Sequence, residues 1–356
     1  MRSACVFPVL NAASREKPKE EGREVDHSAR GRAHHRHLGA VLTALCVPLL
    51  LIAVWFRVYF RAFYSSARPA FPIPGLSENF VPQGIEACGG GDFLLSGYIA
   101  GTGSARLYYV DAGGSFRAIR VCDEKGTTLT SHSGGICTNG PFTYLAGGDG
   151  VCYVLSSADL FDPASREANI LGAIRTDNAA SFCCLEDGRL FVGEYEYGRF
   201  KTAASHHILT PAGDENTAVM LAYQLDGDQP FGVSPAPSAA YSMPARIQGM
   251  CFTGDGRVAL SASSFQASSR MLFYDLDAVT RRQGIFWTGG EAIPLYYLDR
   301  SSCTDKVPLP PYSEETVYSD GRLYVLFESA SSRFRFGQLI GAQNVYRMDV
   351  PGRKEE

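Results

Sequence analysis

One phrase recurs along the chain and constrains its fold more than any other feature. The segments "LEDGRLFVGEY" (185–195), "TGDGRVALSAS" (253–263) and "YSDGRLYVLFE" (318–328) each place a tight-turn pair before an apolar strand. Two degenerate copies are "GGGDFLLSGY" (89–98) and "TNGPFTYLAGG" (138–148). A short strand precedes each copy and another strand follows it. The repeated unit is therefore a small antiparallel sheet.

Five such units in succession predict a β-propeller, an all-β fold whose small sheets stack radially around a central channel. We expect five four-stranded blades, and a sixth fits within residues 199–247 or 265–313. Residues 116–123 and 293–300 are candidates for fourth strands. A β-sandwich is the alternative, but it fits five copies of one three-strand phrase poorly.

The run Leu38–Phe56 contains no charged residue. In helical form it spans about 28 Å, which is close to the thickness of a hydrocarbon core. Pro48 is tolerated in a membrane helix, and Trp55 and Arg57 suit its interface with water. We predict a transmembrane helix. The alternative is a cleaved signal peptide, because "SSA" at 65–67 resembles a cleavage site.

Basic residues are more numerous just before this run than just after it, which predicts a single-pass protein of the cell membrane with a cytoplasmic N-terminus. The expected partners are the lipid bilayer, through 38–56, and an extracytoplasmic ligand. Residues 69–356 carry 22 Lys and Arg against 32 Asp and Glu, which argues against nucleic acid as a partner. The expected organisation is a disordered cytoplasmic tail (1–37), the membrane helix (38–56), a linker (57–77), the propeller ectodomain (78–350) and a disordered tail (351–356).

Propeller geometry predicts which residues share one face. The first strand of each blade lines the channel and the second returns antiparallel, so the starts of first strands and the ends of second strands lie together. A concave rim of amides and carboxylates there is the expected ligand site, as are the insertions 198–217 and 329–343 that project from it. The candidate residues are Gln83, His132, Gln248 and Glu314 at strand starts, and Glu194, Glu196 and Glu328 at strand ends.

Glu194 and Glu196 are two residues apart, so on a strand both side chains point to one side. Paired carboxylates suit acid–base chemistry or cation binding; the alternative is two solvated rim carboxylates. His206 and His207 in the adjoining loop would complete a metal site with these two carboxylates, against the alternative of unliganded histidines. Glu314 at the pore mouth is a separate candidate for cation or substrate contact, against the alternative of a turn or capping role. No cofactor is assigned, and calcium or zinc is the divalent cation that such ligands would take.

Recognisable catalytic motifs are missing: the chain has no Gly-x-Ser-x-Gly elbow, His-Glu-x-x-His helix, phosphate-binding glycine loop or EF-hand pattern. Eight of the ten cysteines follow the apolar run, an even number that disulfides would also explain. However, Cys88, Cys137, Cys183 and Cys251 fall in first strands, where small apolar residues pack between blades. We therefore expect buried free thiols.

Four segments resemble bacterial membrane-anchored β-propeller proteins of uncharacterised role: "VPQGI", "QGMCFTGDGRVALS", "EETVYSDGRLYVLFES" and "HHILTPAGDENTAVMLAYQLD". More distantly they are similar to the gluconolactonase/regucalcin, paraoxonase and NHL-type propellers, over about residues 78–350. In the enzymes of that superfamily, carboxylates and amides around the pore hold a divalent ion, often calcium. The corresponding ring here is Gln83, His132, Gln248 and Glu314, in which no Asp or Asn is evident.

We therefore predict a non-enzymatic module that binds a small molecule, a glycan or a peptide on the face carrying the first-strand starts. The alternative is a metal-dependent hydrolase of lactones or esters, whose ion at the pore mouth polarises the carbonyl and activates water. The sequence leaves enzymatic activity open.

Overall fold

The computed structural model describes residues 44, 46–265, 267–334 and 341–352. The chain divides into two compact units, Met1–Val54 and Trp55–Glu356. In the first unit, residues 46–54 are helical and carry exposed apolar side chains such as Leu50 and Leu51. Among the described residues, no helix has both the length and the apolar character to cross a membrane. The expected span Leu38–Phe56 begins outside the described residues, and the expected tail 1–37 lies wholly outside them.

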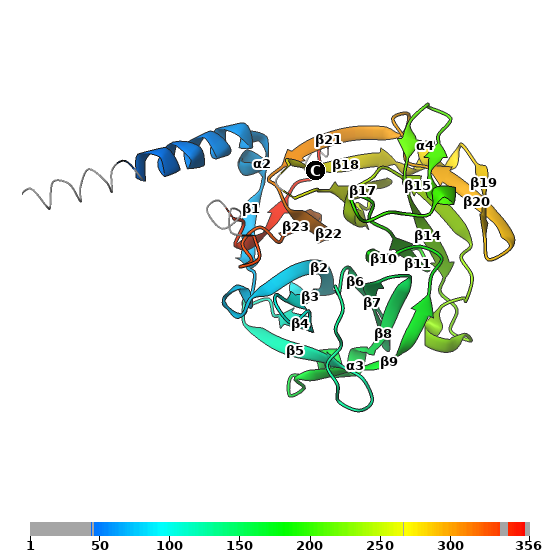
Figure 1. Cartoon of the computed structure of the whole chain (residues 1–356), viewed down its shortest axis with the longest axis horizontal. Coiled ribbons are helices and arrows are strands. Elements are labelled where there is room, and N and C mark those ends of the chain that lie inside the picture. Colours follow the sequence, from blue (N-terminus) through cyan, green and yellow to red (C-terminus); the bar gives the residue numbers. More distant parts are fainter. Residues whose placement is uncertain (1–43, 45, 266, 335–340, 353–356) are drawn as a thin grey trace, which may run out of the picture. The chain divides into compact units, whose positions relative to one another are not determined.

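The second unit contains five four-stranded blades around a common centre (Figure 1). Their inner strands contact one another in the cyclic order β2, β6, β10, β16 and β22. The predicted β-propeller is confirmed, and each sequence repeat corresponds to one blade. From the centre outward, blade 1 is β2 (Phe80–Gly89), β3 (Asp92–Ile99), β4 (Ala105–Val110) and β5 (Phe116–Cys122); blade 2 is β6 (Ile136–Asn139), β7 (Phe142–Gly148), β8 (Val151–Ser156) and β9 (Glu167–Arg175); blade 3 is β10 (Phe182–Glu186), β11 (Arg189–Gly193), β14 (Ala218–Gln224) and β15 (Ala239–Met243); blade 4 is β16 (Ile247–Phe252), β17 (Arg257–Ala262), β18 (Ser269–Asp275) and β21 (Cys303–Leu309); and blade 5 is β22 (Ser313–Ser319), β23 (Arg322–Phe327), β24 (Asn344–Met348) and β1 (Arg68–Pro72).

Turn chemistry explains why the repeated phrase forms hairpins. In blades 3 and 5 the first and second strands are joined by two residues, Asp187–Gly188 and Asp320–Gly321. All four residues have positive φ, which matches the type I′ turn that two-residue hairpins favour. Aspartate and glycine tolerate this conformation better than other residues, so the Asp-Gly pair sets the register of the strand that follows.

The segment 57–77 was expected to be a linker, and this expectation is wrong. It contains helical residues 57–59, the short helix α2 (Arg61–Ser66), strand β1 and the turn η1 (Leu76–Glu78). Strand β1 precedes blade 1 in the sequence, but it pairs antiparallel with β24 and so completes blade 5, the last blade. Aromatic burial explains the difference: the Phe63 ring lies 5.7 Å from that of Phe327, and the Phe71 ring lies 4.9 Å from that of Phe93.

Residues 293–300 do not provide the fourth strand of blade 4. Strand β20 (Glu291–Tyr297) instead forms a hairpin with β19 (Gly284–Thr288) and pairs in parallel with β15 at the edge of blade 3. The chain then returns to blade 4 as β21. Within the described parts of 199–247 and 265–313, the strands extend existing blades or form short hairpins, and none builds a sixth blade. Blades 1 and 2 are likewise joined at their outer edges, through β5 and β9.

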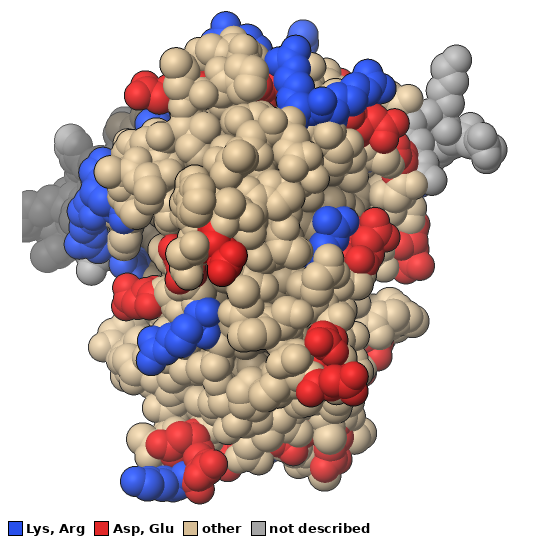
Figure 2. All heavy atoms as spheres, turned by 90° about the vertical axis from the view of Figure 1, so that its right-hand side faces the viewer, with Lys and Arg blue, Asp and Glu red and all other residues tan. Residues whose placement is uncertain are grey.

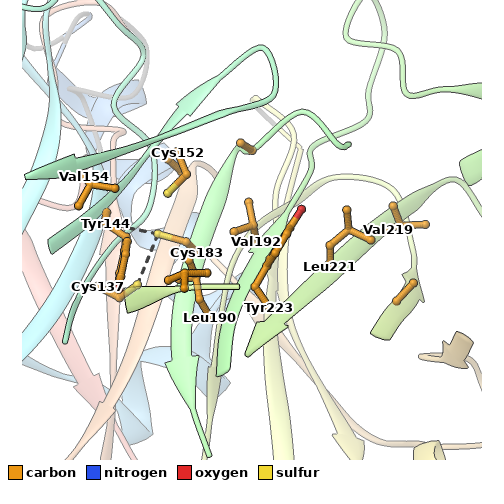
Figure 3. Packing of buried hydrophobic residues seen from close by; sticks show 14 of the residues in the cluster. Cys137, Tyr144, Cys152, Val154, Cys183, Leu190, Val192, Val219, Leu221 and Tyr223 are labelled. Atoms are coloured by element: carbon orange, nitrogen blue, oxygen red, sulfur yellow. Dashed lines mark hydrogen bonds between the residues drawn. The ribbon is translucent and has the colours of Figure 1, made fainter. Parts of the chain in front are cut away.

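Buried apolar layers hold neighbouring blades together. Figure 3 shows the layer between blades 2 and 3, where the Sγ atoms of Cys137 and Cys183 lie 3.6 Å apart and Cys152 lies beside them. All cysteines in the described part of the chain are free, as predicted. Cys183 and its neighbour Cys184 pack against different layers, so the two thiols point to opposite faces of β10. Cys88, Cys184 and Cys303 are only half-buried.

Candidate ligand-binding site at the channel mouth

Bulges in three inner strands bring polar side chains to one end of the central channel, which we call the upper mouth. Strands β2, β16 and β22 each contain a register shift relative to the second strand of their blade. The residues inside these shifts are Gln83, Gln248, and Glu314 with Glu315. A bulge removes a residue from the regular alternation of a strand and re-aims its side chain. Here the re-aimed side chains meet.

A chain of hydrogen bonds links four of the predicted site residues across the upper mouth. Gln83 Nε2 donates to Glu328 Oε2 at 2.8 Å, and Gln248 Nε2 donates to Glu314 Oε1 at 3.1 Å. Glu314 and Glu328 are hydrogen-bonded to each other. We call these four residues the polar floor. It draws on blades 1, 4 and 5, and only Gln248 within it is more than slightly exposed.

The Gln-Gly pair that occurs in both β2 and β16 has a steric cause. A Cβ atom on Gly84 would lie 2.5 Å from the carbonyl oxygen of Gly134 in the neighbouring blade. A Cβ atom on Gly249 would lie 2.4 Å from the Cα atom of Glu315. Each bulged glutamine is thus followed by a position where the next blade approaches too closely for a side chain.

The two carboxyl groups of the polar floor hold protons unusually tightly. Burial, followed by the charge of Glu328, raises the pKa of Glu314 well above its ordinary range. Burial also raises the pKa of Glu328 to about 7, although hydrogen bonds from Gln83 and Glu314 oppose the shift. Two adjacent buried carboxylates repel each other when both are ionised. The pair therefore retains at least one proton at neutral pH and can both donate and accept hydrogen bonds.

Aromatic and basic side chains surround the polar floor. Arg333, from the insertion 329–343, donates a hydrogen bond to the Tyr98 hydroxyl, and its guanidinium carbon lies 5.5 Å from the centre of that ring. The His132 ring lies 5.1 Å from the Tyr98 ring. Arg333 and His132 are exposed, whereas Tyr98 is buried. Desolvation by the surrounding protein, followed by the charge of Arg333, lowers the pKa of His132. His132 therefore lies at the rim rather than in the polar floor.

Tyr195 extends this surround on the side of blade 3. It is half-buried, and its hydroxyl reaches the backbone carbonyl of Ser263 at 3.5 Å. Burial, followed by the charge of Glu314, raises its pKa. Tyr98, Tyr195 and Arg333 were not among the predicted site residues. They lie outside the inner strands. The insertion 329–343, which contains Arg333, was predicted to project from this face, and Tyr98 and Tyr195 lie where second strands end, so the same topological argument could have pointed to them.

Glu315 occupies the channel axis directly below the polar floor. Its Oε2 accepts hydrogen bonds from the backbone N–H groups of Ile85 at 2.9 Å and Ile136 at 3.2 Å, in blades 1 and 2. A Cβ atom on Gly135 would lie 2.2 Å from Oε1. Burial raises the pKa of Glu315 well above its ordinary range, while these backbone donors act in the opposite direction. Glu315 thus fills the centre of the channel and ties inner strands together.

A cavity of about 200 Å³ opens at the other end of the inner strands, which we call the lower mouth. Glu86, Glu186, Cys184 and Tyr318 are among its lining residues, with Glu315 at its inner end. The backbone N–H of Thr138 donates to Glu86 Oε1 at 3.2 Å. Burial raises the pKa of Glu86 to about 7.

Glu194 and Glu196 do not form the pair that their spacing predicted, because β11 ends at Gly193 and the strand geometry ends with it. Glu194 is buried, and its Oε1 lies 2.8 Å from His206 Nδ1 and accepts from the backbone N–H of Val219. Glu196 instead binds Lys201 Nζ at 2.9 Å.

The two neighbouring histidines also diverge. His206 is buried at the end of the turn η2 (Ala204–His206), whereas His207 is exposed and lies 3.1 Å from the Thr202 hydroxyl. Within the described ranges, no three His, Cys, Asp or Glu side chains are grouped so as to hold a metal ion. The expected site of His206 and His207 with Glu194 and Glu196 is therefore brought together only at His206 and Glu194, and Glu314 lies in the polar floor.

Comparisons with known proteins find only distant structural likenesses. No protein-family model and no curated protein matches the sequence. Among solved structures, the chain is similar to a glutaminyl cyclase from Myxococcus xanthus, with 10% identity and a TM-score of 0.39 over 79% of this chain and 94% of that one. An aldose sugar dehydrogenase from Streptomyces coelicolor gives 12% identity and a TM-score of 0.44 over 79% and 97%. The WD40 β-propeller domain of Doa1 gives 8% and 0.38 over 81% and 98%. All three likenesses are distant.

Proposed function

We propose that the protein is a ligand-binding β-propeller that recognises a polar, hydroxyl-rich ligand, such as the end of a glycan, at the upper mouth. The observation that carries this proposal is the hydrogen-bonded polar floor, in which two amides flank a proton-sharing pair of carboxyl groups. Hydroxyl groups both donate and accept hydrogen bonds, and so do the amides and the half-protonated pair.

The surround of the polar floor suits the same ligand class. The half-buried Tyr195 provides apolar ring surface beside the polar groups, a combination typical of small-molecule sites. Arg333 and His132 are exposed at the rim, where a ligand first makes contact. Figure 2 shows the side of the molecule, where acidic and basic side chains occur in small groups on a largely uncharged surface and no large patch of one sign is seen.

The test is a glycan array probed with the detergent-solubilised full-length protein, followed by calorimetric titration of the glycans retained. Gln248→Ala removes the accessible member of the polar floor and should weaken binding about tenfold, the effect of losing one or two buried hydrogen bonds. Glu328→Gln should weaken it as well, because the amide cannot share a proton with Glu314. The matched control is Glu186→Gln, the same chemical change at the lower mouth, which should leave the affinity unchanged. An array without hits, or equal affinity in all three variants, contradicts the proposal.

We also propose that residues 38–56 anchor the chain in the cell membrane, with the N-terminus in the cytoplasm and the propeller outside. The support is the uncharged run itself and the exposed apolar side chains of its described part, among them Leu50, Leu51 and Trp55.

A further inference from the structure

A second cavity lies away from the polar floor and beside the outer strands of blade 4. Its volume is about 610 Å³, within the range of small-molecule sites. Its lining includes β13 (Glu215–Asn216), which lies in the chain between the second and third strands of blade 3, and residues of β18 and β21. Tyr59, just before α2, also lines it. None of the residues of the polar floor contributes to this cavity.

Asp299, which lines the cavity, has an unsatisfied carboxylate oxygen. The side chain is 3% exposed. Its Oδ1 accepts from the backbone N–H of Ser301 at 2.9 Å and from the Ser301 hydroxyl at 2.5 Å. Its Oδ2 is buried and has no hydrogen-bond partner among the described residues. A buried carboxylate oxygen without a partner is costly. A ligand hydroxyl in the cavity would satisfy it.

Three basic side chains line the cavity without an ion-pair partner within the described part of the chain: Arg246, Arg270 on β18 and Lys306 on β21. The guanidinium carbon of Arg246 lies 4.3 Å from the centre of the Tyr197 ring, which leaves Arg270 and Lys306 for a ligand. Lys306 lies opposite Leu272, and Arg270 is two residues before Leu272. Both charges therefore stand on the same face of blade 4 as diagonal cross-strand neighbours, about 7 Å apart at their backbones. The fourth basic residue, Arg300, is already held by Asp214, with Nε to Oδ1 at 2.7 Å.

We infer that this cavity binds a phosphorylated polyol: a phosphate group held between Arg270 and Lys306, with a neighbouring hydroxyl donated to Asp299 Oδ2. Two adjacent cations match a doubly charged group better than a single carboxylate, and both arginine and lysine are effective phosphate ligands. The free acceptor of Asp299 requires a donor on the same ligand, which phosphate alone at neutral pH supplies poorly. Such a group occurs in free sugar or glycerol phosphates and in the headgroups of glycerol-based phospholipids.

The experiment measures binding by calorimetry to the detergent-solubilised full-length protein. The probes are glycerol 3-phosphate, propyl phosphate, which keeps the phosphate but lacks the hydroxyls, and glycerol. Glycerol 3-phosphate should bind at least about tenfold more tightly than either analogue. The double variant Arg270→Gln with Lys306→Gln should lose this binding. The control is Arg281→Gln with Arg282→Gln, which removes two exposed charges between β18 and β19, outside the cavity lining, and should retain it.

Short-chain lipids distinguish the two sources of the ligand. Tighter binding of dioctanoyl phosphatidylglycerol than of glycerol 3-phosphate, with dioctanoyl phosphatidylcholine inactive, identifies a lipid headgroup; the reverse order identifies a free metabolite. Both outcomes support the inference. It is overturned if glycerol 3-phosphate does not bind, if propyl phosphate binds equally well, or if the Arg270/Lys306 variant binds like the control. These results are independent of glycan binding at the upper mouth, which neither double variant touches.

Discussion

Glu315 shows how one residue can act as a structural link at the centre of a closed ring of strands. Its side chain leaves blade 5 and accepts backbone hydrogen bonds from blades 1 and 2. These donors are buried, so their satisfaction depends on an oxygen at this position. The same residue separates the two mouths of the channel.

Replacing Glu315 tests this role. Glu315→Leu keeps most of the volume but leaves the N–H groups of Ile85 and Ile136 without an acceptor, so we expect a loss of about 2–5 kcal/mol in the free energy of unfolding. Glu315→Gln keeps one acceptor oxygen and should cost about 1 kcal/mol. Urea denaturation of the purified variants measures both. Equal stability of Glu315→Leu and the wild type would show that the hydrogen bonds are not needed.

Glu86 predicts a pH dependence of stability. Its pKa rises from 4.5 to about 7 on folding. Below the lower value both states carry the proton and its contribution is complete. Between the two values the unfolded chain loses the proton while the folded chain keeps it, so stability falls as pH rises, by at most about 1.4 kcal/mol per pH unit for this group. Above about 7 the contribution is gone.

The check is the unfolding free energy of Glu86→Gln and of the wild type, measured from pH 4 to pH 8. The amide does not titrate, so the variant should lose stability less steeply than the wild type between pH 4.5 and about 7. Parallel curves would contradict the prediction. Glu328 contributes a similar slope in both proteins because its pKa is also about 7.

Sequence reasoning predicted the polar floor better than its surroundings. Gln83, Gln248, Glu314 and Glu328 were identified because propeller topology fixes which strand ends meet. The pairing of Glu194 with Glu196 failed because it assumed that the strand continued beyond Gly193. Bulges leave no reliable trace in a single sequence, so the role of Glu315, next to a predicted residue, was not visible.

At the scale of elements, local turns were predictable and long-range strand pairing was not. Asp-Gly pairs specify hairpins from adjacent residues, and the predicted inner strands agree with β2, β6, β10, β16 and β22. In contrast, β1 pairs with β24, a strand near the opposite end of the sequence, and β20 pairs with the edge of an earlier blade. Such partners depend on which sheet edge is free in the folded molecule.

The closing strand β1 gives a prediction at this scale. Phe71 packs against Phe93 in the layer between blades 5 and 1 and is 9% exposed. Phe71→Ala should destabilise the protein by about 3 kcal/mol and accelerate proteolysis around β1, because it loosens the closure of the ring. The control is Trp287→Ala, at a site that is 68% exposed, with an expected effect within about 0.5 kcal/mol. Equal protease resistance in both variants would mean that β1 is dispensable.

At the scale of the whole molecule, the proposed membrane anchor can be tested by alkaline extraction of membranes from expressing cells. The full-length chain should remain in the membrane pellet. Leu50→Arg with Leu51→Arg places two charges in the apolar run, at a cost of about 2.5–3.5 kcal/mol each near the centre of a bilayer, and should shift the protein to the soluble fraction. Release of the unchanged protein by alkali would rule out an integral anchor.

The filled axis has a consequence for what kind of molecule this propeller can accommodate. A polymer cannot be threaded through it from one side to the other, because the Glu315 side chain stands in the way and the backbone at Gly135 and Gly249 closes in around it. A long saccharide can therefore enter only as far as its terminal residues. Under the proposed glycan recognition, the protein would respond to the number of chain ends rather than to chain length, and cutting one polysaccharide into many fragments would create more ligands for it.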